Sequence, residues 1–253
     1  MALGGGINFY GFSAFFVPLS EEFGWSRSVL SGVFALSRLE GGLLGPVEGW
    51  LIDRFGPRKL MLIGIPLMGL GFILLSQVNS LFTLYVVYIL AITFGGGLGT
   101  FAPAGAAVAN WFVKKRGTAL GVIMSGVAIG GGLLLPLIGW WITRFGWRHA
   151  AVAAGIFIIA LGIPIASIMR HRPEQYGQLP DGEEPSNEID DSTNQEELNT
   201  ANSNSVAPLE FTAREAIKTS AFWFLGASLS VRSLTTTGIT IHFVAMMVDR
   251  GFS

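Results

Sequence analysis

The chain has 253 residues, of which 51% are hydrophobic and only 13% charged, with 34 glycines and a formal net charge of -1. A soluble domain carries about twice that share of charged residues, so the composition indicates a protein whose solvent is the lipid bilayer. The near-neutral charge gives no electrostatic basis for binding nucleic acid, and the absence of cysteine excludes disulfides, thiolate metal sites and a cysteine nucleophile.

Seven apolar segments follow one another along the chain. Most of them reach the ~20 residues that a helix needs to cross ~30 Å of hydrocarbon. The first is followed by Glu21 and Glu22 in place of a small-residue cleavage site, so it is predicted to be a helix clipped at its start rather than a signal peptide. The segments are 1–19, 28–52, 60–76, 82–109, 118–142, 149–169 and 221–248.

Segment 28–52 carries charges that are costly in a membrane unless they have partners or face water. Arg38 shares a helix face with glycines at every fourth position, so it is predicted to point into the bundle; the alternative is a structural ion pair with another helix. Glu40 lies two positions further, about 200 degrees around the helix, and therefore cannot pair with Arg38 directly. Glu40 is a candidate for proton coupling. The glycines predict a flat stripe for helix packing, with or without a role in gating: Gly41, Gly45 and Gly49.

The stretch "GWLIDRFGPRK", residues 49–59, places four charges around two glycines. It resembles the G-x-L-x-D-R-x-G-R-K signature between the second and third helices of the major facilitator superfamily. The resemblance implies an all-α membrane fold and a conformational latch formed by charge-assisted bonds that break between gating states. Glu48 is expected to join this latch; the alternative is that the basic residues only fix the topology. The residues of the signature are Gly49, Asp53, Arg54, Gly56, Arg58 and Lys59.

Two later stretches narrow the resemblance. "NWFVKKRGTALGVIMSG", residues 110–126, is similar to the start of the fifth helix in monocarboxylate porters and oxalate/formate exchangers, and "FGWRHA", residues 145–150, stands where such proteins carry Gly-Trp-Arg. Val127 follows Gly126 where the antiporter signature of the family has proline, so this signature does not support an antiporter assignment. The glycines of "GGGLG", residues 95–99, predict close helix contacts in the fourth segment.

Basic residues orient the bundle. With the signature loop in the cytoplasm, ten arginines and lysines lie inside and four outside, which follows the positive-inside rule and places the N-terminus in the cytoplasm. The inner ones are Arg54, Arg58, Lys59, Lys114, Lys115, Arg116, Arg170, Arg172, Arg214 and Lys218, and the outer ones are Arg27, Arg144, Arg148 and Arg250.

Three domains are predicted from the change in composition. Residues 1–169 form an N-terminal six-helix bundle, the acidic and polar residues 170–220 form a disordered cytoplasmic linker, and residues 221–253 begin a second bundle. Residues 11–26 and 238–253 align without gaps with five identities in sixteen, as expected of a transporter built from repeated halves. The resemblance implies twelve helices, so the chain is expected to be truncated after the seventh.

The seventh segment carries a polar stripe at helical spacing, which predicts one wall of a substrate cavity. Arg232 near its middle is predicted to clamp a carboxylate, with snorkelling toward the interface as the alternative. Arg38 is a second positive partner, and two arginines within the spans against one mid-membrane carboxylate, Glu40, predict a cavity with excess positive charge. His242 is a second candidate for proton coupling, or else is simply packed. The other proposed binding residues are Ser228, Thr235, Thr236, Asn8 and Tyr10.

No motif for hydrolysis, zinc catalysis or phosphate binding is present, which argues against an enzyme, a metal site or a cofactor. The resemblance implies a multi-pass transporter of the cell membrane that works by alternating access. Its expected substrate is a small organic anion, such as a monocarboxylate, oxalate or formate, moved by proton symport or anion exchange. Transport of sugars or drugs is one alternative, and a receptor or sensor that does not transport is another.

Overall fold

The computed structural model describes residues 7, 12–170, 173, 181, 213–232 and 235. The chain divides into two units, Met1–Asn187 and Glu188–Ser253, and the division falls inside the predicted linker. The described residues form helices and no strand, which confirms the predicted all-α fold.

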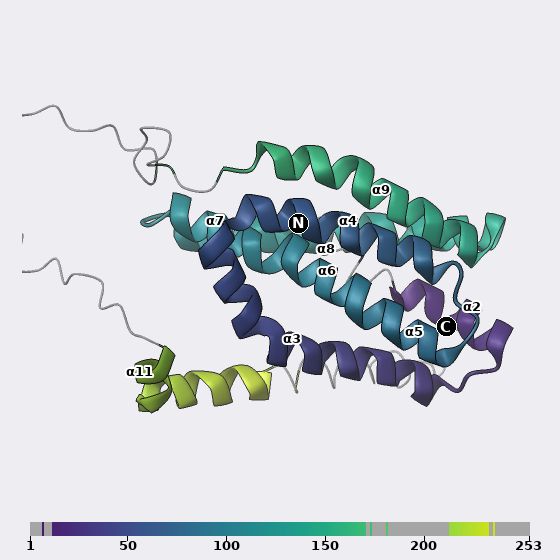
Figure 1. The fold of residues 1–253 in the computed structure, drawn as a ribbon, viewed down its shortest axis with the longest axis horizontal. Coiled ribbons are helices and arrows are strands. Elements are labelled where there is room, and N and C mark those ends of the chain that lie inside the picture. Colours follow the sequence, from purple (N-terminus) through teal and green to yellow (C-terminus); the bar gives the residue numbers. More distant parts are fainter. Residues whose placement is uncertain are drawn as a thin grey trace, which may run out of the picture. The chain divides into compact units, whose positions relative to one another are not determined.

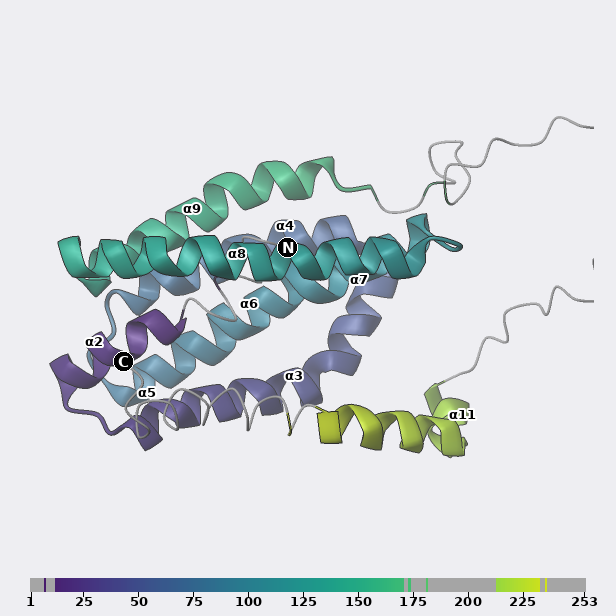
Figure 2. The ribbon, with the colours of Figure 1, turned by 180° about the vertical axis from the view of Figure 1, so that it is seen from behind.

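Unit 1 contains long helices that run back and forth (Figure 1, Figure 2). One of them, from Leu81 to Trp111, is continuous but changes its winding between α-helical and π-helical turns, which occur frequently at functional sites. In chain order the elements are α2 (Phe12–Phe23), α3 (Arg27–Phe55), α4 (Pro57–Leu75), α5 (Leu81–Val86), η2 (Val87–Thr93), α6 (Phe94–Gly96), η3 (Gly97–Phe101), α7 (Ala102–Trp111), α8 (Arg116–Phe145) and α9 (Trp147–Ile168).

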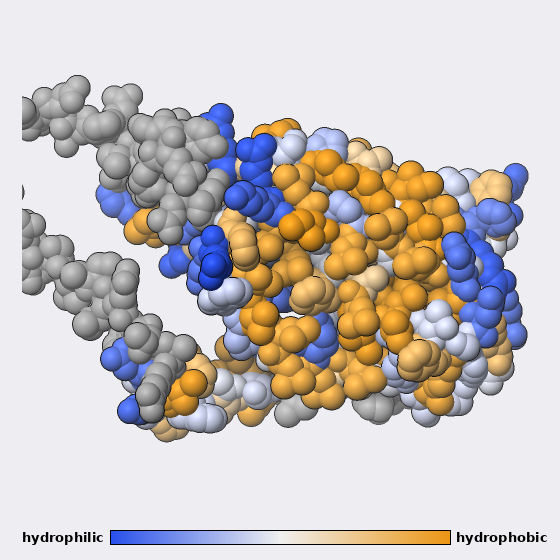
Figure 3. Space-filling view, in the orientation of Figure 1, coloured by the Kyte–Doolittle hydropathy of each residue, from blue (hydrophilic) through white to orange (hydrophobic). Residues whose placement is uncertain are grey.

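Four helical segments of unit 1 are long and apolar enough to cross a membrane: Pro57–Leu75, Leu81–Trp111, Arg116–Phe145 and Trp147–Ile168. Helix α3 has 29 residues but carries Arg38, Glu40 and Glu48 within its length, which lowers its mean hydropathy. Hydrophobic residues cover the middle of the face in Figure 3, and hydrophilic residues collect toward its two ends. This is the surface that a bilayer requires.

Two helix junctions are built on the same glycine conformation. Gly56 (φ +83°) separates α3 from α4, and Gly146 (φ +84°) separates α8 from α9. Each glycine donates its N–H to the carbonyl four residues earlier, at 2.8 Å to Ile52 and 2.9 Å to Ile142. Only glycine adopts this positive φ without strain, which explains why glycine occupies both junctions.

The two junctions lie at opposite ends of unit 1 (Figure 1). The end with Gly56, where α7 also finishes, is called the signature end, and the end with Gly146, where α2 also finishes, is called the far end. The stretches around the two glycines, "IDRFGPRKL" (52–60) and "ITRFGWRHA" (142–150), share five of nine residues. One junction sequence therefore serves both ends of the bundle.

Helix α4 is the centre of the packing. A Cβ on Gly64 would lie 2.7 Å from the carbonyl oxygen of Gly95 and would also meet the backbone of Gly99. On another side of α4, a Cβ on Gly69 would lie 2.8 Å from the carbonyl oxygen of Gly155 in α9. The close contacts predicted for "GGGLG" are thus confirmed for Gly95 and Gly99, and their partner is the backbone of α4.

The glycine stripe of α3 is different. Apart from the adjoining turns of α3 itself, no atom of the described residues lies within 4 Å of a Cβ built at Gly41, Gly45 or Gly49. Packing of another helix on this stripe stays a prediction.

Hydrogen bonds at the far end tie α2, α4 and α9 together. The guanidinium of Arg148 donates to Glu22 Oε1 at 2.5 Å, to the carbonyl of Ser76 at 3.0 Å and to Asn79 Oδ1 at 3.2 Å. Trp147 Nε1 donates to the second oxygen of Glu22 at 2.5 Å. A bidentate carboxylate and a planar fork of donors fix the ends of three helices at once.

Unit 2 contains α11 (Ala213–Lys218) and helical residues 220–232. Trp223 Nε1 donates to the carbonyl of Ile217 at 2.9 Å and joins these two pieces. The domain boundaries predicted from composition are not tested by these helices and stay predictions.

Candidate functional site

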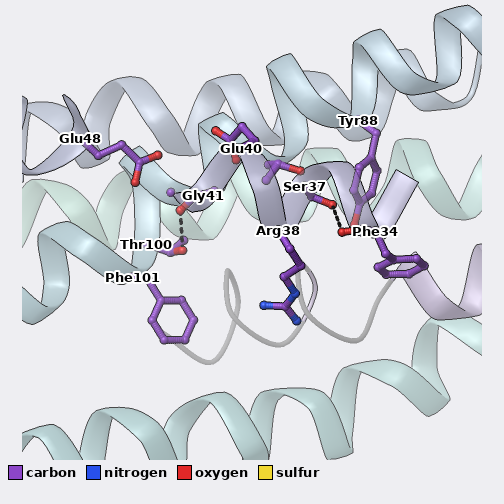
Figure 4. Close-up of a pocket in the computed structure, with 12 residues that line it drawn as sticks. Phe34, Ser37, Arg38, Glu40, Gly41, Glu48, Tyr88, Thr100 and Phe101 are labelled. Atoms are coloured by element: carbon purple, nitrogen blue, oxygen red, sulfur yellow. Dashed lines mark hydrogen bonds between the residues drawn. The ribbon is translucent and has the colours of Figure 1, made fainter. Parts of the chain in front are cut away.

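A cavity of about 320 Å³ opens in unit 1 between α3 and the helical stretch η2–η3 (Figure 4). Most of the lining residues from the second wall lie in π-helical turns, which occur frequently at functional sites. The lining residues are Phe34, Ser37, Arg38, Glu40, Gly41 and Glu48 from α3, and Tyr88, Thr93, Gly96, Gly97, Thr100 and Phe101 from the other wall.

Two carboxyl groups are buried in this cavity. Glu40 exposes 9% of its surface and Glu48 7%, although both belong to a helix with many exposed residues. They are eight residues apart, which at 100 degrees per residue leaves them about 80 degrees apart on the helix, so they share one side of α3. Figure 4 shows both side chains on the same side of the helix.

Gly97 makes room for Glu48. A Cβ built on Gly97 would collide with the carboxylate of Glu48, with Oε2 at 2.9 Å and Oε1 closer still. The "GGGLG" stretch therefore faces two neighbours, because Gly95 and Gly99 contact α4 while Gly97 admits the carboxylate of α3. A larger residue at any of these three positions would move a helix or the acid.

The hydroxyl groups in the cavity are mostly occupied by their own helices. Ser37 Oγ donates to the carbonyl oxygens of Val33 (2.8 Å) and Phe34 (3.2 Å), and Thr100 Oγ1 donates to that of Gly96 (2.6 Å). In contrast, Glu40 Oε1 and Thr93 Oγ1 are buried without a hydrogen-bond partner among the described residues. Buried polar atoms rarely lack a partner, so these two oxygens call for one outside the described residues, such as water, a ligand or a proton.

Arg38 leaves α3 on a different side from the two acids. Its guanidinium projects away from Glu40 and Glu48 in Figure 4, and its side chain is exposed. The predicted angular separation of Arg38 and Glu40 is thus seen in the structure. The role of Arg38 in binding an anion stays a prediction.

One expectation for this region needs correction. Glu48 is expected to join the latch at the membrane edge, but it is buried in the cavity with Glu40, where Gly97 leaves room for its carboxylate. The excess of positive charge expected in the substrate cavity stays a prediction, because Arg232, one of its two arginines, belongs to unit 2.

The signature residues surround the α3–α4 junction. Asp53, Arg54, Arg58 and Lys59 are exposed, and the guanidinium of Arg54 lies 5.3 Å from the ring centre of Trp50. Within the described part of the chain Asp53 has no ion-pair partner. An exposed carboxylate beside the Gly56 turn is available to another helix end, as a latch requires, and the latch stays a prediction.

The substrate residues predicted on the seventh segment belong to unit 2. Ser228, Arg232 and Thr235 are exposed there, and Thr235 Oγ1 donates to the carbonyl of Val231 at 2.9 Å. Four further candidates, Asn8, Tyr10, Thr236 and His242, lie outside the described residues. The structure therefore brings Arg38, Glu40 and Glu48 to one cavity and leaves the predicted clamp untested.

Asp181 was not singled out from the sequence. Its carboxylate accepts backbone N–H groups of Lys114 (2.7 Å), Val113 (3.0 Å) and Lys115 (3.2 Å) in the loop before α8. These hydrogen bonds, together with the charge of Lys115, lower the pKa of Asp181. The signal available in the sequence was an aspartate followed by glycine, a pair typical of tight turns.

Comparison of the sequence with known proteins identifies the family of the chain. A sequence model of the Major Facilitator Superfamily matches residues 1–253. The chain is 29% identical to monocarboxylate transporter 14 of Mus musculus, over 65% of the chain and 32% of that protein, and 31% identical to the oxalate:formate antiporter of Oxalobacter formigenes, over 66% and 40%. It is also 29% identical to the glycerol-3-phosphate transporter of Bacillus subtilis, over 66% and 38%. The chain thus spans about a third to two fifths of the length of these relatives.

Proposed function

Because the chain belongs to the Major Facilitator Superfamily, we propose that it is part of a secondary active transporter that works by alternating access. Two six-helix bundles rock around a site near the midplane of the membrane. The main support is the polar cavity between α3 and η2–η3, since polar and ionisable groups inside a membrane mark substrate or ion pathways. The protein is a multi-pass membrane protein, and we place it in the cell membrane with its N-terminus and the signature end in the cytoplasm.

The proposed substrate is a small organic anion, such as a monocarboxylate, oxalate or formate. The names of two relatives, a monocarboxylate transporter and an oxalate:formate antiporter, support this class. Arg232 acts as the carboxylate clamp because a guanidinium offers a planar fork of donors that matches a carboxylate. Arg38 is the second cation, and the remaining contacts come from the polar residues predicted beside them: Ser228, Thr235, Thr236, Asn8 and Tyr10. Either proton symport or exchange for another anion drives the cycle.

A second candidate is the transport of a cationic organic compound. The observation in its favour is the pair of buried carboxyl groups, Glu40 and Glu48, which attract positive charge if they are ionised. This alternative loses its basis if the two groups are neutralised by protons.

Uptake by vesicles tests the proposal. The full-length protein is reconstituted into liposomes, and uptake of labelled oxalate, lactate and formate is compared for the wild type, Arg232→Gln and Arg232→Lys, with the exposed Arg144→Gln as the control. Lysine keeps the charge and loses the fork, so the clamp predicts partial loss with lysine, near-complete loss with glutamine and normal uptake in the control. Equal uptake by all variants removes Arg232 from the site, and uptake of a labelled organic cation alone supports the second candidate.

A further inference from the structure

The cavity between α3 and η2–η3 contains more buried acid than an anion site needs. Its titratable and charged lining residues are Arg38, Glu40 and Glu48 on α3 and Tyr88 on η2. Arg38 projects away from both acids (Figure 4), and a tyrosine hydroxyl is neutral at ordinary pH. In the described part of the chain, no cation therefore lies between the two buried carboxyl groups.

Keeping both carboxylates ionised in this buried cavity would cost a large free energy. Burial of an isolated carboxylate favours its protonated form, and a second carboxylate nearby favours it further. The unpartnered Glu40 Oε1 shows directly that one oxygen of the pair lacks the hydrogen bonds that a buried carboxylate requires. The site therefore calls for a positive ligand.

The number of acidic groups selects the ligand. A metal cation takes about six oxygen ligands at short distance, usually with several carboxylates among them. The Ser37 and Thr100 hydroxyls donate to carbonyl oxygens of their own helices and keep their lone pairs, but the acidic residues among the described lining are Glu40 and Glu48 alone. Among the described residues no group of three or more acidic, histidine or cysteine side chains could hold a metal ion. A proton needs only one carboxylate oxygen.

We propose that Glu48 and Glu40 form the coupling-proton site of the transporter, which makes the transport mode proton symport; this inference rests on the proposed function. Water on one side of the membrane gives a proton to one carboxylate, a new O–H bond forms, and the pair loses one negative charge. After the bundles rock, that O–H bond breaks and the proton passes to water on the other side. No electrons are transferred.

Transport under an imposed pH gradient tests the site. Liposomes containing the full-length protein are loaded at alkaline pH, and accumulation of labelled oxalate is compared with oxalate exchange at equal pH. We expect the gradient to drive accumulation in the wild type. Glu48→Gln and Glu40→Gln should lose at least about tenfold of this accumulation but retain exchange, because an amide imitates the protonated acid while it cannot release a proton.

Two further variants control for folding and charge. Glu48→Asp keeps a carboxyl group and should retain gradient-driven accumulation, and Glu21→Gln, at an exposed position on α2, should match the wild type. If Glu48→Gln accumulates oxalate under the gradient as the wild type does, the proposal is wrong.

A second measurement does not depend on the substrate. Infrared difference spectroscopy of the purified protein in lipid detects the carbonyl stretching band of protonated carboxyl groups. We expect this band in the wild type at neutral pH, a weaker band in each Gln variant and no change on adding sodium. The same band in all variants, or its loss on adding sodium, overturns the proton site. If no organic anion is transported under any gradient, the proposed function is wrong. The infrared spectrum still shows in that case whether Glu40 and Glu48 hold a proton.

Discussion

Two acidic residues of α3, Glu48 and Asp53, are only five positions apart but have different surroundings. Glu48 is buried against Gly97 in the cavity, whereas Asp53 is exposed in the last turn of the helix, just before Gly56. A buried acid in a membrane protein is a candidate for binding or proton transfer, and an exposed acid at a helix end is a candidate for bonding another helix. The two residues therefore belong to separate tests.

Replacing Asp53 by asparagine should slow transport. The exchange keeps the size of the side chain but removes the charge and replaces one acceptor oxygen by an NH2 donor, so a latch would lose a charge-assisted bond of about 1.5–3 kcal/mol. A loss of this size in one gating state corresponds to a rate change of about tenfold or more. The measurement is the initial rate of labelled oxalate uptake, with the amount of inserted protein determined in parallel and Glu21→Gln as the control. Normal turnover in Asp53→Asn would exclude the latch.

At this scale the sequence predicts the burial of Glu40 but not that of Glu48. Glu40 stands in an apolar segment, so its burial follows from the cost of placing a charge in lipid. Glu48 stands next to the signature, and its position along the chain suggested the membrane edge. The spacing of eight residues that places both on one face was present in the sequence, but the space beside Gly97 follows only from how η3 packs on α3.

Helix α4 shows how strongly one element depends on small residues. Replacing Gly64 by alanine should destabilise unit 1 by about 1–3 kcal/mol, because the new Cβ meets the backbone of Gly95 and Gly99, which cannot rotate away as a side chain can. The measurement is the midpoint of thermal unfolding in detergent. Gly139→Ala in α8 is the matched control, since nothing lies within 4 Å of its Cβ and alanine favours the helix. Equal midpoints for the two variants would contradict the packing described for α4.

The glycine pattern illustrates what sequence reasoning can reach for an element. The regular spacing of Gly41, Gly45 and Gly49 marks a face that is smooth in any helix, and "GGGLG" marks a second one. Which face meets a partner depends on the neighbouring helices. In unit 1 the contact occurs at Gly95 and Gly99, whose partner Gly64 lies in a segment without a regular glycine spacing.

Asp181 should attach its segment to the loop before α8 in a pH-dependent manner. The N–H donors of Lys114, Lys115 and Val113 lower its pKa in the folded state. The ionised carboxylate therefore stabilises the attachment fully at pH values above the ordinary pKa of an aspartate. The contribution is lost as the pH falls through the lowered pKa, when protonation removes the acceptor charge. Hydrogen exchange of the amides at 113–115, corrected for the intrinsic rate, measures it.

Asp181→Asn gives the same test at constant pH. This variant should show faster exchange at residues 113–115 at neutral pH, and Glu183→Gln in the same acidic segment should not. Protection that is unchanged in Asp181→Asn, or independent of acid in the wild type, would contradict the attachment.

At the scale of the whole molecule, the two ends of unit 1 use related junctions for different contacts. At the signature end the charges next to Gly56 are exposed, and at the far end Arg148, two residues after Gly146, is bonded to Glu22, Ser76 and Asn79. The positions Arg58 and Arg148 correspond in the two stretches, but only the second is engaged by described residues of the same unit. The far end is therefore fixed within the bundle, while the charges of the signature end are exposed, as the predicted latch requires.

The orientation of the bundle can be tested because residues 1–253 contain no cysteine, so an introduced cysteine is the one reactive thiol among them. We expect Lys59→Cys and Lys115→Cys at the signature end to face the cytoplasm, where the excess of arginine and lysine belongs, and Gln77→Cys and Arg144→Cys at the far end to face outward. All four positions are exposed in the structure, so accessibility from the correct side is the only condition for labelling.

A membrane-impermeant maleimide applied to intact cells should therefore label the two far-end variants at once and the two signature-end variants only after the membrane is permeabilised. The reverse pattern would place the signature end outside and remove the positive-inside argument, and labelling of one variant from each end in intact cells would contradict the alternation of α4, α8 and α9 across the membrane.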